Sequence, residues 1–249
     1  LTSIEIPKSL KAGNTAYLNE YAYGYVYGPF YGCDGLKNVT FEEGILRIPE
    51  GLFAHCPGLN EITIPDTVTK IGDRAFDTSN NLNKVVIPKK LEIIGEFVFS
   101  NCSALTEMDF SDTAVSEMGN YCFGSCTGLQ MIKLPKNYKI IKANTFDSCS
   151  KLGRIELPES IEIIESSAFA KSGLKNIIIP VNVKRIDQQA FQSSKLESIT
   201  IKDATVVIGN RAFESCENLS QVELGKKTES IEHSAFKNCD KLEYINIPD

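Results

Sequence analysis

The sequence has no tryptophan, three methionines and two histidines, and its 249 residues carry a net charge of −6. This acidic balance argues against sequence-independent adhesion to nucleic acid or to an anionic membrane, because both need a surplus of Lys and Arg. No run approaches the roughly 18 apolar residues that cross a bilayer, so no membrane insertion is expected. No basic and apolar leader precedes the pattern that starts at Leu1, so we expect that a signal peptide was removed or that there was none.

Sequence motifs of catalysis and of metal binding are absent as well. There is no G-x-x-x-x-G-K-[ST], no G-x-G-x-x-G after a strand pattern and no H-E-x-x-H. His55 and His233 occupy non-equivalent positions, and no Ser, Cys or carboxylate recurs beside either in the order of a catalytic triad. The sequence therefore predicts a protein that is not an enzyme and that holds no cofactor or metal.

A repeat is the dominant feature of the chain. Ten of the thirteen phenylalanines recur every 22 to 24 residues, at Phe30, Phe53, Phe76, Phe99, Phe123, Phe146, Phe169, Phe191, Phe213 and Phe236. A period of this length predicts a stack of structural copies, each in contact with its neighbours. About six buried side chains per copy barely offset the backbone entropy of about 23 residues, so one copy should not fold alone. We therefore expect a single domain over residues 1–249, with regular copies over residues 30–249.

Each copy contains two apolar residues separated by one residue, as in Ile62 and Ile64. This alternation is typical of a strand with one buried face. Such pairs run from Ile4 and Ile6 to the last copy, which predicts about eleven parallel strands on one concave sheet. The rest of the unit is too short for a full crossover helix and is predicted to form short turns or a 3₁₀ segment on the convex side. The predicted fold class is an α/β repeat solenoid.

The unit Leu-x-x-Ile-x-Ile-Pro-x-x-Val-x-x-Ile-x-x-x-Ala-Phe-x-x-Cys resembles the leucine-rich repeat of the BspA-like, or Treponema-type, bacterial surface proteins. The resemblance covers residues 30–249, and a fragment of the unit lies at residues 1–10. It implies a leucine-rich-repeat horseshoe, a cell-surface or extracellular location, and adhesion to proteins of a host or of neighbouring cells.

The first copy departs from this pattern through an insertion at residues 11–29. The segment around it is rich in tyrosine and contains Tyr17, Tyr21, Tyr23, Tyr25, Tyr27 and Tyr31, six of the nine in the chain. Tyrosine offers a large amphipathic surface and is enriched at interfaces. The insertion is therefore interpreted either as an aromatic contact site or as a flap that packs over the first copies.

Seven of the eight cysteines share one slot, three residues after the repeat phenylalanine. They are Cys33, Cys56, Cys102, Cys126, Cys149, Cys216 and Cys239. Ser79, Ser172 and Ser194 occupy the same slot, so the position favours a small side chain that tolerates burial and weak hydrogen bonding. Residues stacked about 4.8 Å apart keep their Cβ atoms farther apart than the roughly 3.8 Å of a disulfide, so free, buried thiols are expected. The lone C-x₃-C at Cys122 and Cys126 does not predict a zinc site.

The residues that alternate with the buried strand positions should point outward from the concave sheet. The candidate binding residues among them are Glu61, Thr63, Lys84, Glu107, Asp109, Lys133, Arg154, Glu156, Glu223 and Tyr244. A mixed-charge stripe with Val86, Met131 and Ile178 exposed suits a protein partner. The alternative is a solvated face whose charges only pair across neighbouring strands, each pair contributing little.

The favoured function is that of a non-enzymatic protein-binding module of a bacterial cell-surface or secreted protein. It would bind host or neighbouring-cell proteins through the concave face. One alternative is a structural spacer that holds another domain away from the cell surface. Another is a glycan-binding module that uses the tyrosine-rich insertion, because Tyr244 is the single aromatic residue expected on the concave face. The ligand, the organism and the oligomeric state stay open.

Overall fold

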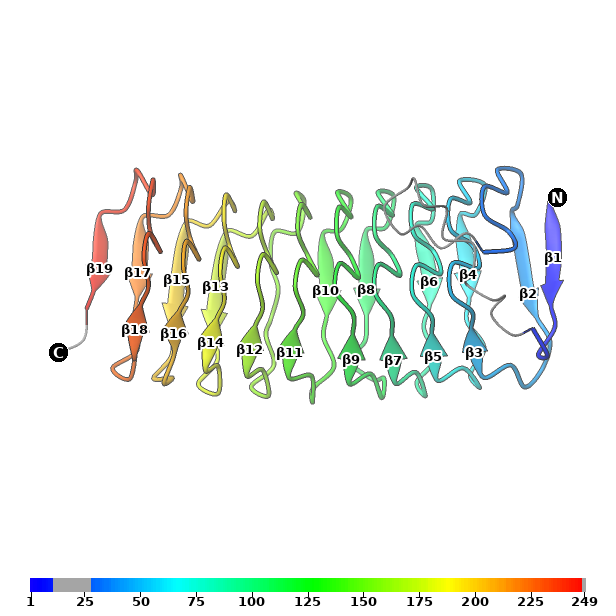
Figure 1. Cartoon of the computed structure of the whole chain (residues 1–249), viewed down its shortest axis with the longest axis horizontal. Coiled ribbons are helices and arrows are strands. Elements are labelled where there is room, and N and C mark those ends of the chain that lie inside the picture. The colour runs from blue at the N-terminus through cyan, green and yellow to red at the C-terminus, as the bar shows by residue number, and fades with distance from the viewer. Residues whose placement is uncertain (11–27, 248–249) are drawn as a thin grey trace, which may run out of the picture.

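The computed structural model of the chain describes residues 1–10 and 28–247. These residues form nineteen short strands, stacked copy upon copy along one long axis with β1 at one end and β19 at the other (Figure 1). All the strand pairs are parallel and join consecutive copies. The described part of the chain is thus a parallel β-solenoid, and the tyrosine-rich insertion lies almost entirely outside it.

The apolar alternation predicted from the sequence forms one row of strands, here called the long-strand row. It comprises β1 (Ser3–Ile6), β2 (Asn38–Phe41), β4 (Glu61–Thr63), β6 (Lys84–Val86), β8 (Glu107–Asp109), β10 (Met131–Lys133), β13 (Asn176–Ile179), β15 (Ser198–Ile201), β17 (Gln221–Glu223) and β19 (Tyr244–Asn246). Residues 154–156 take the corresponding place between β10 and β13 but join the row only through a bridge between Lys133 and Glu156. Their middle residue, Ile155, is buried and its two neighbours are exposed, as in the strands.

A second row of strands, the short-strand row, was not predicted. It comprises β3 (Arg47–Ile48), β5 (Lys70–Ile71), β7 (Ile93–Ile94), β9 (Glu117–Met118), β11 (Ile140–Ile141), β12 (Ile163–Ile164), β14 (Arg185–Ile186), β16 (Val207–Ile208) and β18 (Ser230–Ile231). Figure 1 shows it running beside the long-strand row. Within residues 1–10 and 28–247 there is no α-helix or 3₁₀-helix, so the predicted α/β class is not confirmed. The segment predicted to lie on a convex side is extended because equivalent residues of neighbouring copies pair their backbones there.

The predicted single sheet of about eleven strands is not confirmed either. Four separate ladders make up the long-strand row: β1 with β2, β4 with β6, β8 with β10, and β13-β15-β17-β19. The row is therefore interrupted between β2 and β4, between β6 and β8, and around residues 154–156. Strands of the long-strand row pair only within each of these ladders. At the interruptions, the other sides of the solenoid hold the copies together.

The third side of the solenoid is a turn around the repeat phenylalanine. Two residues with positive φ flank that phenylalanine, one two positions before it and one two positions after it, as in Asn144 (φ 56°) and Ser148 (φ 60°) beside Phe146. The amide groups of these three residues donate to carbonyls of the next copy, at 3.0, 2.8 and 2.8 Å. The turns consequently form a third hydrogen-bonded ladder, whose alternating backbone conformation differs from that of a strand.

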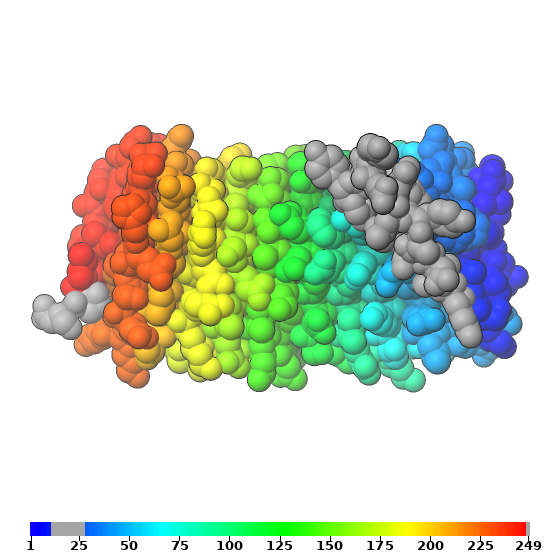
Figure 2. Space-filling model, viewed as in Figure 1, coloured from blue at the N-terminus to red at the C-terminus, as the bar shows by residue number. Residues whose placement is uncertain are grey.

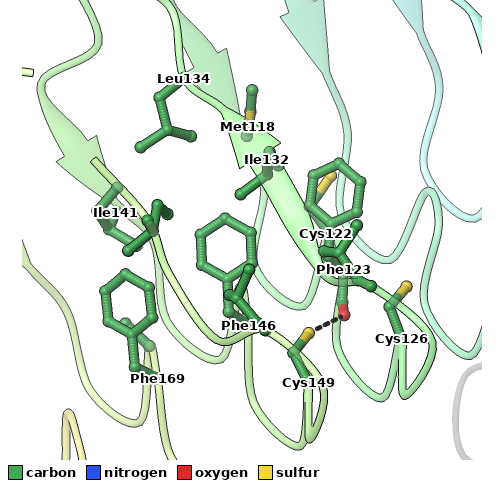
Figure 3. Packing of buried hydrophobic residues seen from close by; sticks show 14 of the residues in the cluster. Met118, Cys122, Phe123, Cys126, Ile132, Leu134, Ile141, Phe146, Cys149 and Phe169 are labelled. Atoms are coloured by element: carbon green, nitrogen blue, oxygen red, sulfur yellow. Dashed lines mark hydrogen bonds between the residues drawn. The ribbon is translucent and has the colours of Figure 1, made fainter. Parts of the chain in front are cut away.

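The core between these three sides contains a continuous column of phenylalanine rings. Successive rings from Phe30 to Phe236 stack with centroids 5.1 to 6.0 Å apart. Phe123, Phe146 and Phe169 illustrate the column in Figure 3. The eight inner rings are completely buried, which confirms the prediction for them. Phe30 and Phe236 are only half-buried, because each is a terminal ring of the column.

All eight cysteines are free thiols, and the ladder slot has a defined hydrogen-bonding role. Cys149 Sγ lies 3.1 Å from the carbonyl oxygen of Phe123, the repeat phenylalanine of the preceding copy (Figure 3). Ser79 Oγ donates to the carbonyl oxygen of Phe53 at 2.8 Å in the same way. Burial raises the pKa of the Cys56 thiol to about 11. The expectation that every ladder thiol is buried is wrong at the two ends, where Cys33 and Cys239 are half-buried.

Candidate functional site

The ten candidate binding residues all lie on the outward side of the long-strand row, here called the long-strand face, and all are exposed. They form two columns, because each strand presents one residue before and one residue after its buried central residue. Glu61 is opposite Lys84, and Asp109 is opposite Lys133, in the parallel register. Glu223 and Tyr244 lie in β17 and β19, toward the far end of the solenoid from Glu61 and Thr63 (Figure 1).

The charged residues near the middle of the long-strand face are partly paired with one another. Lys133 Nζ lies 2.7 Å from Asp109 Oδ2, and Lys84 Nζ lies 3.8 Å from Glu61 Oε2. Hydrogen bonds from Lys133 and Ser111 lower the pKa of Asp109 to about 2, and the same contact raises the pKa of Lys133.

Further contacts place the other charged candidates. Arg154 pairs with Glu156 of its own strand segment, and Glu156 is bridged by its backbone to Lys133. Among the ion pairs of the described residues, none includes Glu107. Glu223 accepts a hydrogen bond from Thr200 Oγ1 at 3.1 Å. Exposed ion pairs of this kind contribute only about 0–1 kcal/mol, so charge pairing alone does not account for this face.

Apolar exposure distinguishes the long-strand face more clearly. The side chains of Val86, Met131 and Ile178 are 44%, 46% and 58% exposed. They belong to three copies, with one intervening copy between each pair along the row. Exposed apolar side chains that recur on one face, among charged residues, match the composition of a protein-binding surface.

Three grooves hollow the long-strand face, and each one lies at an interruption of the ladder. The first groove, of about 620 Å³, lies at the interruption between β6 and β8 and extends to Met131 and Lys133. The central groove, of about 580 Å³, lies between β10 and residues 154–158. The third groove, of about 670 Å³, lies between residues 153–159 and the strands β13 and β15. The surface is therefore open at two of the three interruptions, the one between β6 and β8 and the one around residues 154–156.

The central groove has an apolar floor and a charged rim. Ile132, Leu134 and Ile155 line it from the core side and are almost completely buried. Met131 and Leu157 add apolar surface at its walls. The charged lining residues are Lys133, Lys136, Arg154 and Glu156. Lys133, Arg154 and Glu156 were predicted as binding residues, whereas Lys136 was missed because it lies beyond the strand, two residues after Leu134.

An aromatic column on the turn side was also missed. Phe97 lies between the guanidinium of Arg74, 4.0 Å from the Phe97 ring centroid, and the ring of Tyr121, stacked at 4.6 Å. The signal in the sequence is a bulky residue two positions before the repeat phenylalanine in three consecutive copies. Because both faces of the Phe97 ring are in contact with these neighbours, this column packs mainly against itself.

The described part of the chain shows neither a metal-binding cluster nor a membrane-spanning helix. Within residues 1–10 and 28–247, no group of three or more His, Cys, Asp or Glu side chains is placed to hold a metal ion. The same residues contain no helix long and apolar enough to span a membrane. The tyrosines of residues 11–27 lie outside the described residues, and Tyr31 packs against His55 with ring centroids 4.9 Å apart. The role of the insertion therefore stays a prediction.

Comparison with known proteins identifies a related family. The model of the BspA type leucine-rich repeat region matches residues 27–153 and 139–249. No curated protein matches the chain. Among solved structures, a leucine-rich repeat protein from Bacteroides ovatus is 26% identical over 82% of this chain and 70% of its own, with a TM-score of 0.48. The T. pallidum leucine-rich repeat protein is 22% identical over 83% of this chain and 77% of its own, with a TM-score of 0.46.

A third similar structure is a leucine-rich cell surface protein from Faecalibacterium prausnitzii. It is 22% identical over 90% of this chain and 79% of its own, with a TM-score of 0.41. The first two structures are described as leucine-rich repeat proteins, and the third is described as a leucine-rich cell surface protein.

Proposed function

The chain belongs to the BspA-type leucine-rich repeat family, and on that premise we propose that it is a non-enzymatic protein-binding module of a bacterial cell-surface or secreted protein. Its partner is a protein of a host or of a neighbouring cell, bound at the long-strand face. The family supports an interaction role, and the surface location is the one that the resemblance of the repeat implies.

The observation that carries the proposal is the coincidence of grooves and exposed apolar side chains. Val86 and Met131 line the first groove, Met131 also lines the central groove, and Ile178 lines the third groove. Protein interfaces bury an apolar centre inside a polar rim, and a few centrally placed residues dominate the affinity. A spacer that only holds another domain has no use for recurrent exposed apolar residues at open grooves.

A library of random peptides displayed on phage tests this function, because it samples many partner sequences at once. The bait is the immobilised protein, and the comparison bait carries Glu107→Ala, Lys133→Ala and Arg154→Ala together. We expect selected clones to bind the triple variant at least tenfold more weakly, because close charge contacts at an interface are lost or left unpaired. The melting temperature should hardly change, since exposed ion pairs add about 0–1 kcal/mol.

The matched control replaces the tyrosines of residues 17–27 by serine. These clones should bind the control variant normally if the long-strand face is the site. If the clones keep their affinity for the triple variant but lose it for the tyrosine variant, the binding site is the insertion and not the long-strand face. Failure to enrich any clone on the native protein counts against a binding module.

A further inference from the structure

The central groove adds a statement about the chemistry of the partner. We propose that it is the anchoring subsite of the long-strand face, and that it takes an extended peptide segment in which apolar side chains are flanked by carboxylates. This inference rests on the proposed function and narrows it, because it specifies which part of the face makes the main contact and what it recognises.

The charge of the central groove differs from that of the protein as a whole. Three cations and one anion line it, Lys133, Lys136 and Arg154 against Glu156. The first groove has two cations and two anions, and the third has three cations and two anions. In a chain with a net charge of −6, the central groove is thus the most cationic of the three. A basic groove attracts and orients an acidic segment.

Lys136 is the cation that remains available to a partner. Lys133 is engaged by Asp109 at 2.7 Å, and Arg154 is engaged by Glu156. Among the ion pairs of the described residues, none includes Lys136, which is exposed. Its carbonyl oxygen accepts a hydrogen bond from Ser160 Oγ at 2.7 Å. The backbone at Lys136 is therefore tied to the next copy while its side chain is free to meet a carboxylate.

The apolar floor supplies the anchor for the segment. Ile132 and Ile155 occupy equivalent positions in neighbouring copies, and the backbones around them share only the bridge from Lys133 to Glu156. Leu157 lies at one wall of the central groove and is half-buried. Met131 lies at the opposite wall, and its side chain is 46% exposed. An aliphatic side chain seated between these walls is removed from water, as the central residues of an interface are.

The place of the groove between two consecutive copies favours an extended segment. Paired copies are about 4.8 Å apart, whereas a helix with its side chains is about 10–12 Å across, so an extended chain fits the space between copies better. The central and third grooves share Arg154, Glu156 and the two apolar residues Ile155 and Leu157, so they lie on the two sides of residues 154–157. An extended chain lying across the copies can place successive same-face side chains in both grooves.

Three synthetic peptides test the proposal by NMR titration of the isotope-labelled protein. Their central sequences are Glu-Leu-Ile-Leu-Glu, Lys-Leu-Ile-Leu-Lys and Glu-Ser-Asn-Ser-Glu. We expect the first peptide to bind at least tenfold more tightly than either of the others, with shift changes at Met131, Lys136 and Leu157. Equal affinity for all three peptides, or shift changes confined to other parts of the protein, would overturn the proposal.

Matched variants separate the groove from general charge and hydrophobicity. Lys136→Glu and Met131→Ser should each lower the affinity for the Glu-Leu-Ile-Leu-Glu peptide, here called the acidic apolar peptide, at least tenfold. Lys226→Glu is the control for charge, because Lys226 is exposed and occupies the slot equivalent to Lys136, two residues after Leu224. Val181→Ser is the control for apolar exposure, since Val181 is 47% exposed and lines none of the three grooves described above. Both controls should leave the affinity unchanged.

The results of the two experiments distinguish the two proposals. If phage clones lose affinity for the triple variant while Lys136→Glu has no effect on the acidic apolar peptide, the groove inference fails and the protein-binding function stands. If no clone is enriched and no peptide binds, both fail. If Lys226→Glu lowers the affinity for the acidic apolar peptide as much as Lys136→Glu does, the effect is one of general charge. That result would also overturn the groove inference.

Discussion

At the scale of single residues, the slot three positions after the repeat phenylalanine has one task. Its side chain donates a hydrogen bond to the phenylalanine carbonyl of the preceding copy, whether the donor is the thiol of Cys149 or the hydroxyl of Ser79. In most copies this carbonyl also accepts the backbone amide of its own copy, as Phe123 O does from Cys126 N at 3.1 Å, so the slot supplies it with a second donor. Two serines depart from this pattern: the buried Oγ of Ser172 has no hydrogen-bond partner within the described residues, and Ser194 Oγ pairs with Cys216 Sγ at 3.3 Å.

The same substitution should have opposite effects at two copies of this slot. Ser79→Ala removes the bond to the Phe53 carbonyl and the acceptor of the Cys56 amide, at 2.8 and 3.2 Å. We expect it to lower the free energy of unfolding by about 1–3 kcal/mol. Ser172→Ala removes an unpaired buried hydroxyl and should be neutral or stabilising. Urea denaturation of both variants checks this, and equal losses would contradict the hydrogen-bonding role of the slot.

The Asp109 carboxyl should titrate well below its ordinary value of 3.8. Hydrogen bonds from Lys133 and Ser111 hold its pKa at about 2 in the folded protein. Because a lowered pKa favours the ionised form, the contribution of this contact is present above about pH 4 and is lost as the pH falls through about 2. A carbon-detected NMR titration of the carboxyl should give this midpoint. Lys133→Ala should raise it toward 3.8, and an unchanged midpoint in that variant would exclude Lys133 as the cause.

At the scale of elements, the turn around the repeat phenylalanine departs most from what its residue types favour. Within residues 1–10 and 28–247, seventeen residues other than glycine have positive φ, and arginine, phenylalanine and tyrosine are among them. This backbone region costs an ordinary residue about 1–2 kcal/mol. The cost is offset because the amides of the turn pair with the next copy, as Ser193 N does with the Glu214 carbonyl at 2.9 Å.

Thr78 occupies the position two residues after a repeat phenylalanine with a φ of 60° and a hydroxyl that donates to Asp77 Oδ1 at 3.1 Å, but valine cannot make that bond and should be poorly tolerated there. Ser193 has φ of 55° and an exposed side chain, so Ser193→Val tests backbone strain without removing a packed group. We expect the free energy of unfolding to fall by about 1–2 kcal/mol. Ser150→Val is the control, since Ser150 is also exposed and its φ is not positive. A similar loss in both variants by urea denaturation would show that strain at the turn is not the cause.

At the scale of the whole molecule, three hydrogen-bonded sides enclose one apolar core. Figure 2 shows the copies as adjacent bands from end to end, and the buried residues form a single cluster. The long-strand row is interrupted, but the turn side and the phenylalanine column continue across its breaks. This redundancy allows the long-strand face to open into grooves without separating the copies.

Truncation of one ring should affect the stack according to its position. Phe146 lies between two rings at 5.8 and 5.3 Å and is completely buried. Phe146→Ala should lower the free energy of unfolding by about 3–5 kcal/mol. Phe236→Ala should cost clearly less, because Phe236 is half-buried and stacks on one ring. Urea denaturation measures both, and a single transition of the native protein also tests the predicted single domain. Equal losses would contradict an end effect.

Much of the architecture is readable from local sequence pattern. The period of the phenylalanines predicted the column of rings, and the alternation at Ile62 and Ile64 predicted the long-strand row. The residues that alternate with these buried positions were predicted to point outward, and they do. The cysteine slot was recognised from its spacing, although its acceptor was not. Such features follow from which residues can be buried, and burial is encoded by residue type and period.

The tertiary structure decided the rest. The two-residue strands of the short-strand row are too short for an alternation to show, and their pairing arises only when neighbouring copies align. Where the ladder stops beside residues 154–156 is likewise set by how consecutive copies pack, and so is the meeting of Lys136 with the apolar floor of the central groove. Residue type and period determine what each copy buries, whereas the spacing between copies, a property of the assembled stack, determines where its surface opens.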